Sequence, residues 1–202
     1  MAGYVPFTVK LDNGTVVGVE DFTDRQVWSG ANIASSASAE VTLFKYTKGM
    51  SVAKSGTASD VTADFRHTNV QHNGTMPQTD GVEIRTIAYE FPLDVTLVNL
   101  QQLAERIWTE LYFGSERPVY SFLARHAPPG TGIWGVTTAN AVNVWNIGLP
   151  DPTHRLKFNV PLAIRPGDQY RADVRIQGGA LTMASADVFM RLILRGVGPT
   201  PP

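Results

Sequence analysis

Cysteine is absent from the 202-residue chain. Its absence excludes disulfide bonds, cysteine zinc ribbons, cysteine nucleophiles and iron–sulfur clusters in one step. The redox compartment stays open, because a chain without cysteine is compatible with any compartment. A chain of this length buries roughly 70% of its unfolded surface, so it needs no covalent cross-link to fold.

Charge and long apolar runs are scarce too. Lys and Arg number 17 against 18 Asp and Glu, for a formal net charge of -1. No run of basic residues occurs, so tight or sequence-specific nucleic-acid binding is not expected. No stretch approaches ~18 consecutive apolar residues, and the N-terminal "MAGYVPFTVK" lacks the basic and apolar regions of a signal peptide. We therefore expect a soluble protein made in the cytoplasm.

Glycine and proline are plentiful by contrast, at 18 and 13 residues, and they favour turns over long helices. Asn13-Gly14 lies between two β-branched runs and predicts a hairpin with a type I′ turn. A strand is also expected just before the loop at Pro128-Pro129-Gly130. The other strands that we predict, each bounded by turn signals, cover residues 40–46, 81–91, 155–164, 169–176 and 187–197.

Alternation predicts which side chains point inward on three of these strands. The inward sets are Ile87, Tyr89 and Phe91; Tyr170, Ala172, Val174 and Ile176; and Val188, Met190, Leu192 and Leu194. Arg85 interrupts the first of these strands and Pro92 ends it. The opposite face of the last strand mixes Phe189, Arg191, Ile193 and Arg195, as if it met another surface.

Two connections carry distinct signals. The strands 155–164 and 169–176 read as a paired hairpin around Pro166-Gly167, where glycine suits the third position of a type II turn. Residues 95–113 show three- and four-residue apolar spacing, through Leu97, Leu100 and Leu111, which predicts one amphipathic helix ended by Gly114. This pattern of many strands and one helix favours an all-β antiparallel sandwich or barrel in a single domain, 1–202.

The sequence offers little evidence of a catalytic site. A cupin needs converging imidazoles, but no His-x-His occurs, and His67 and His72 are five apart, on opposite faces of a strand. The other two histidines are His126 and His154. No nucleophile turn, Walker loop or dinucleotide fingerprint is present. A glycosidase pair drawn from Asp151, Asp168 or Asp173 with Glu83 or Glu90 is left open as a minor alternative. We predict no catalytic residue, no metal ligand and no cofactor.

The tryptophans are the strongest candidates for contacts outside the domain. Trp28 and Trp108 suit packing, whereas Trp134 and Trp145 lie in Gly/Asn-rich loops. We expect these loop tryptophans to contact another protein subunit, with a glycan as the alternative.

Several segments together carry a family resemblance. These are "EVTLFKYTKGM", "TADFRHTNVQHNGTMP", "VPLAIRPGDQY" and "DVFMRLILRGV". Over residues 40–197 the chain resembles the jelly-roll capsid proteins of tailless icosahedral bacteriophages, although Phe65, Arg66 and His67 intervene within the second motif.

The resemblance implies a single jelly-roll domain that is a structural protein of the virion capsid and not an enzyme. It would self-associate, with other capsid proteins, into capsomers and an icosahedral shell, in some cases above an internal membrane. "GYVPF" and the polyproline-like "GVGPTPP" suit extended arms that cross a neighbour. Bridging of subunits by divalent ions through Asp60 or Asp80 is left open. The alternatives are a virion spike or glycan-binding jelly roll and, less favoured, a cupin-like enzyme.

Overall fold

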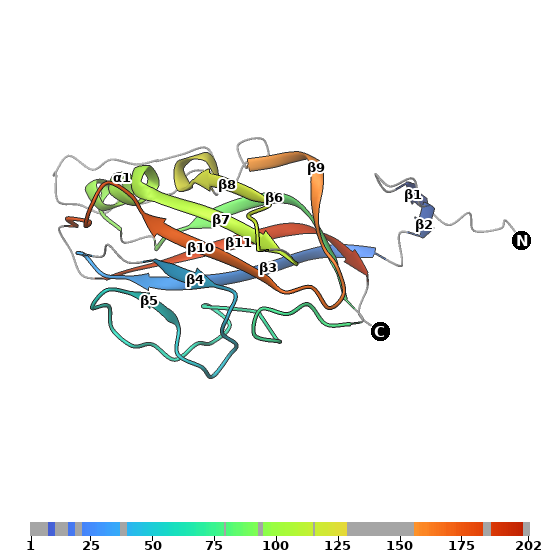
Figure 1. Ribbon diagram of the computed structural model, residues 1–202, viewed down its shortest axis with the longest axis horizontal. Coiled ribbons are helices and arrows are strands. Elements are labelled where there is room, and N and C mark those ends of the chain that lie inside the picture. The colour runs from blue at the N-terminus through green and yellow to red at the C-terminus, as the bar shows by residue number, and fades with distance from the viewer. Residues whose placement is uncertain are drawn as a thin grey trace, which may run out of the picture.

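Two β-sheets pack face to face in the computed structural model (Figure 1). It describes residues 8–10, 16–18, 22–36, 40–78, 80–92, 95–114, 116–128, 156–183 and 187–199. The five-stranded sheet has the order β5 (Ala53–Ser55), β3 (Phe22–Ile33), β11 (Val188–Pro199), β6 (Val82–Glu90) and β9 (Leu156–Ile164). The four-stranded sheet has the order β4 (Val41–Leu43), β10 (Tyr170–Ile176), β7 (Ile107–Phe113) and β8 (Tyr120–Leu123). The all-β prediction is confirmed, as an open sandwich and not a closed barrel.

The antiparallel pairs of the two sheets are nested along the chain. β3 pairs with β11, β4 with β10, β6 with β9, and β7 with β8. Among the described strands of these two sheets, β7 and β8 are the only consecutive strands that pair with each other. The other consecutive strands from β6 to β11 lie in different sheets, so the chain repeatedly crosses between them.

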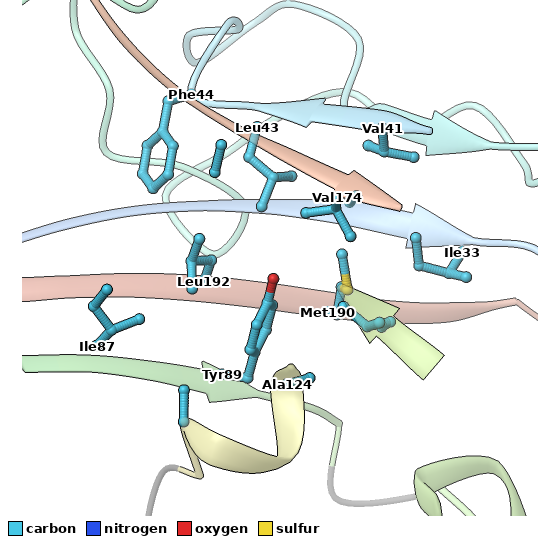
Figure 2. Close-up of a cluster of buried hydrophobic side chains, with 14 of the residues drawn as sticks. Ile33, Val41, Leu43, Phe44, Ile87, Tyr89, Ala124, Val174, Met190 and Leu192 are labelled. Carbon is cyan, nitrogen blue, oxygen red and sulfur yellow. The ribbon is translucent and has the colours of Figure 1, made fainter. Parts of the chain in front are cut away.

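The core lies between the sheets and consists of alternate residues from facing strands (Figure 2). Met190, Leu192 and Leu194 are fully buried, and Ile87, Tyr89, Ala172 and Val174 are buried from neighbouring strands. The predicted inward faces are therefore confirmed. Asp173 is an exception on the outer face, because it is only 7% exposed.

The predicted helix over residues 95–113 is wrong in its second half. Helix α1 spans Leu97–Arg106, with the Thr96 side chain accepting from the Asn99 N–H, and β7 begins at Ile107. Ile107 and Leu111 are four residues apart, which fits both a helix face and the period of a strand. The neighbouring strands determine that residues 107–113 form a strand, because β10 and β8 lie on the two sides of β7 and pair with it.

The predicted hairpin of residues 155–164 with 169–176 is also wrong. β9 pairs with β6 and β10 pairs with β7 and β4, so the turn at 165–168 crosses from one sheet to the other. The turn itself has the expected form: Gly167 has φ +78°, and the Asp168 N–H donates to the Arg165 carbonyl at 3.0 Å. The sequence signal located the turn correctly but not the pairing.

Three local features bear on the sequence predictions: the middle of β6, the end of β4 and the N-terminal hairpin. Arg85 does not interrupt β6, which runs unbroken from Val82 to Glu90, but the pairing of β6 with β9 shifts register between Ile84 and Thr86. β4 is shorter than residues 40–46, because Phe44 adopts φ +68° and leaves the strand. β1 (Thr8–Lys10) and β2 (Val16–Gly18) form the predicted N-terminal hairpin, whereas its turn residues Asn13 and Gly14 lie outside the described residues.

The ends of the chain are partly described. β11 continues to Pro199, so Gly198 and Pro199 belong to the sheet and pair with Thr23 and Phe22. "GYVPF" and residues 200–202 lie outside the described residues. In the part of the chain that is described, no helix is long and apolar enough to cross a membrane.

Candidate interaction surfaces

Part of the outer face of the five-stranded sheet is covered by the chain itself. Residues 44–76, between β4 and β6, form a small second cluster with Tyr46, Val52 and Ala63 buried and Phe189 packed against it. Tyr46 accepts a hydrogen bond from the Gly30 N–H at 3.0 Å, and its hydroxyl donates to the Gly30 carbonyl. A Cβ at Gly30 would lie 2.2 Å from the Phe189 ring, so the close packing of Phe189 on Gly30 requires glycine at this position. The mixed face predicted for β11 thus meets the protein's own loop.

The same loop protects the free edge of β3. The Asn69 side chain accepts from the Trp28 N–H at 2.7 Å and donates to the Gln26 carbonyl at 2.6 Å, while its own N–H donates to the Trp28 carbonyl. Asn69 therefore satisfies backbone groups that an unpaired edge would offer to another chain.

Asn69→Ala is expected to lower the free energy of unfolding by about 1 kcal/mol, since two hydrogen bonds to the β3 backbone are lost. It should also raise concentration-dependent aggregation, because the β3 edge becomes available for pairing. Urea denaturation and light scattering measure the two effects. Gln71→Ala, at an exposed position of the same loop, is the control. Equal stability of the two variants would contradict this role for Asn69.

The three histidines that the structure describes do not form a metal-binding group. His67 lies in a loop, with Nδ1 2.7 Å from the Asp64 carboxylate and its ring packed edge-on against Phe189. His72 is likewise in a loop, so the expectation that the two occupy opposite faces of one strand is wrong. His126 ends a short 3₁₀ helix and His154 lies outside the described residues. Among the residues that the structure describes, no group of three or more His, Asp or Glu could hold a metal ion.

The four candidate glycosidase carboxylates that the structure describes each have another partner. The Asp168 carboxylate accepts from the Arg165 N–H at 3.0 Å within the turn. Glu90 binds Arg191, and Glu83 lies 3.9 Å from Arg85. These glutamates belong to the five-stranded sheet, whereas Asp173 lies on the outer face of the other sheet. Packed sheets are about 10 Å apart, so Asp173 is not paired with either glutamate. Asp151 lies outside the described residues.

The proposed ion-bridging residues are similarly engaged. Asp60 lies 2.8 Å from the Lys54 ammonium, and Asp80 lies 3.0 Å from the Arg25 guanidinium. The side chain of Asp60 is largely exposed, while that of Asp80 is mostly covered.

The outer face of the four-stranded sheet carries an ordered network of polar and aromatic side chains. We call it the polar face; its members are Glu40, Thr42, Trp108, Glu110, Tyr112, Arg171, Asp173 and Arg175. Arg175 joins two carboxylates, at 2.9 Å from Glu40 and 3.4 Å from Glu110. Glu110 also accepts from the Tyr112 hydroxyl at 2.8 Å, and this hydrogen bond raises the pKa of Tyr112.

Arg171 links the rest of the polar face. Its guanidinium stacks 4.1 Å from the centre of the Tyr112 ring and donates to Asp173 at 3.1 Å. Asp173 also accepts from the Thr42 hydroxyl at 2.9 Å. The network fixes long side chains that would otherwise be mobile at a surface, so the face is pre-organised.

A hollow of about 690 Å³ lies at the end of the polar face. Tyr112 and Arg171 line it from the sheet, and Lys45, Glu116 and Asp168 line it from the loops. Its walls include Gly74, Gly114 and Gly167, all with positive φ. Sequence reasoning missed this hollow because its residues come from separate loops.

Of the four tryptophans, the structure describes two. Trp108 lies on the polar face, and its indole N–H donates to Glu110. The Trp28 indole N–H donates to the Phe65 carbonyl at 3.0 Å on the other sheet. Trp134 and Trp145, the predicted partner contacts, lie outside the described residues.

These features define the class of the protein as a two-sheet β-sandwich, with one outer face partly covered by its own loop and the other carrying the polar face. Comparison of the chain with protein-family models, curated proteins and solved structures found no match.

Proposed function

We propose that the chain is a single jelly-roll capsid subunit that self-associates into capsomers and an icosahedral shell. The nesting of its strand pairs is the observation that carries the proposal. β3 and β11 form the outermost pair, β4 and β10 the next, then β6 and β9, with β7 and β8 innermost. A long antiparallel hairpin rolled into two sheets has this order, and such jelly rolls build viral capsids as well as lectins and cupins.

Among capsid proteins, lectins and cupins, the polar face favours a protein that self-associates. Trp, Tyr and Arg are enriched in protein–protein interfaces, and the polar face contains all three, with Arg171 stacked over the largely buried Tyr112 ring. The ion pairs of Arg175 and the stacking of Arg171 already hold these side chains in place. Binding a neighbour would therefore cost less side-chain entropy.

Native mass spectrometry with negative-stain microscopy of the purified chain tests the proposal. Pentamers, hexamers or shells are expected, and a stable monomer at all concentrations would count decisively against it. Arg175→Glu places a third carboxylate beside Glu40 and Glu110, so it should weaken association about tenfold or more.

Arg85→Glu is the matched control for this substitution. Arg85 is similarly exposed, with 44% of its side chain accessible against 47% for Arg175, but it lies on β6 in the other sheet. If both substitutions weaken assembly equally, the polar face is not the contact. Circular dichroism establishes that each variant is folded.

A glycan-binding jelly roll is the second candidate, favoured by the hollow beside Tyr112. Aromatic and charged side chains with an open polar cavity suit a sugar. A monomer that binds an oligosaccharide, with loss of binding in Tyr112→Ala, would select this candidate over the capsid subunit.

A further inference from the structure

A groove of about 540 Å³ lies on the outer face of the five-stranded sheet, beside the covering loop. Phe91 and Pro92 line it at the end of β6, and Phe189 lines it from the start of β11. Val61 and His67 form the side contributed by the loop. The His67 ring packs edge-on against Phe189 with ring centroids 4.9 Å apart, so two adjoining aromatic rings form part of the groove wall.

The charged groups around the groove are paired with one another. The Arg191 Nε–H donates to Glu90 at 2.8 Å, and an Arg191 terminal N–H donates to the Arg66 carbonyl at 3.0 Å. Arg66 and His67 both contact Asp64 at 2.7 Å, and the hydrogen bond from Arg66 holds the pKa of Asp64 well below its usual range. These pairs leave the groove suited to an uncharged occupant, since no charge on the occupant is needed to balance them.

The sequence contains one segment with matching chemistry. Pro199-Thr200-Pro201-Pro202 is the only Pro-x-x-Pro in the given sequence, and residues 196–202 include no charged side chain. In a polyproline II helix, which has three residues per turn, prolines three positions apart lie on the same edge. Aromatic-lined grooves recognise segments of this kind. We propose that the Pro199–Pro202 segment of a second copy of this chain binds in the groove.

The geometry of β11 requires a second copy. Phe189 and Pro199 lie near opposite ends of this strand, ten residues apart, which is about 33 Å in an extended chain. Pro202 follows Pro199 by three residues, so it reaches at most about 11 Å further. Figure 1 shows that β11 ends on the side of the sandwich away from α1. A subunit's own Pro-x-x-Pro segment thus cannot enter its own groove.

This inference rests on the proposed self-association and names one of its contacts. The test places a photoreactive benzoylphenylalanine at Thr200 of the full chain, between the two prolines. A mixture of ¹⁴N- and ¹⁵N-labelled protein is irradiated, and cross-linked peptides are identified by mass spectrometry. We expect links between copies to peptides that contain Phe91 or Phe189.

Variants of the photoreactive chain then separate the groove from other contacts. Pro202→Ala in the Pro-x-x-Pro segment and Pro92→Ser in the groove should each lower the yield at least several-fold. Val160→Ser removes a 77% exposed apolar side chain from β9, outside the groove, and should leave the yield unchanged. Links confined to one copy, links to other surfaces, or yields insensitive to both proline substitutions would overturn the proposal.

A peptide of residues 195–202, titrated into the labelled chain and followed by NMR, distinguishes this inference from the proposed function. Saturable shifts of groove residues are expected, with none for the peptide in which alanine replaces the prolines. Peptide binding by a chain that stays monomeric would support the groove and contradict the capsid role. If shells form but the cross-links lie elsewhere and the peptide does not bind, the capsid role is supported and the groove proposal is contradicted.

Discussion

Gly196→Ala is expected to lower the free energy of unfolding by about 3 kcal/mol, at the upper end of the usual cost of overpacking. A Cβ at this position would lie 1.7 Å from the Glu83 carbonyl oxygen and 2.9 Å from the Ile84 Cα. Both are backbone atoms of β6, so no side-chain rotation relieves the clash. β11 must separate from β6 where their pairing already shifts register, between Arg195 and Gly196.

Urea denaturation measures the loss, and Gly49→Ala is the matched control. Gly49 has φ +89° with nothing within 4 Å of its built Cβ, so alanine there costs only backbone strain, about 1 kcal/mol. The reasoning would be contradicted by equal destabilisation in the two variants. A loss of assembly in Gly196→Ala carries no information on interfaces, because the sheet itself is disturbed.

Tyr89→Phe is expected to cost about 2 kcal/mol, because it leaves the Thr109 hydroxyl buried without its partner. Tyr89 lies on β6 and Thr109 on β7, and their hydroxyls form a hydrogen bond across the core. Both residues are completely buried. Figure 2 shows the Tyr89 side chain extending from its strand into the core. This hydrogen bond connects the two sheets of the sandwich.

The double variant Tyr89→Phe/Thr109→Val tests this reasoning. Replacing both partners with apolar groups removes the buried polar atoms together, so most of the stability should return. Urea denaturation of the two single variants and the double variant completes the cycle. If the double variant loses the sum of the two single losses, the hydroxyls are not coupled and the proposed sheet-to-sheet bond is wrong.

The buried Tyr89, which bonds to Thr109, also makes the free energy of unfolding depend on pH. Burial raises the pKa of Tyr89 well above its ordinary value, while the hydrogen bond to Thr109 opposes the shift weakly. The folded state keeps the proton that the unfolded state releases above about pH 10. The stability that this group contributes is therefore fully present below pH 10 and declines as pH rises, by about 1.4 kcal/mol per unit. Tyr89→Phe should reduce that slope, and Tyr170, whose pKa is also raised by burial, should account for part of the remainder.

Sequence reasoning was most successful for local features. The alternation along β11 identified its buried face correctly, since successive side chains of a strand point to opposite sides whatever the partner. Pro166 and Gly167 identified a type II turn, because their own φ preferences are sufficient. Each of these depends on residues close together in the chain.

The candidate surfaces were less accessible to prediction. The polar face joins Glu40 to Arg175 and Thr42 to Asp173, which are more than 130 residues apart. Nothing in either segment alone indicates the other. The mixed face of β11 was noticed, but its cover by residues 44–76 was not foreseen, because a loop of small and polar residues has no signal for where it docks.

The sequence by itself determined that the protein is built of strands, which side chains face the core and where several turns fall, since these follow from local sterics and alternation. Only the tertiary structure decided that residue 107 begins a strand, and that β9 and β10 enter different sheets. The physical reason is that every strand offers the same N–H and C=O groups. Its partners are therefore chosen by the packing of the whole sandwich and not by its own residues.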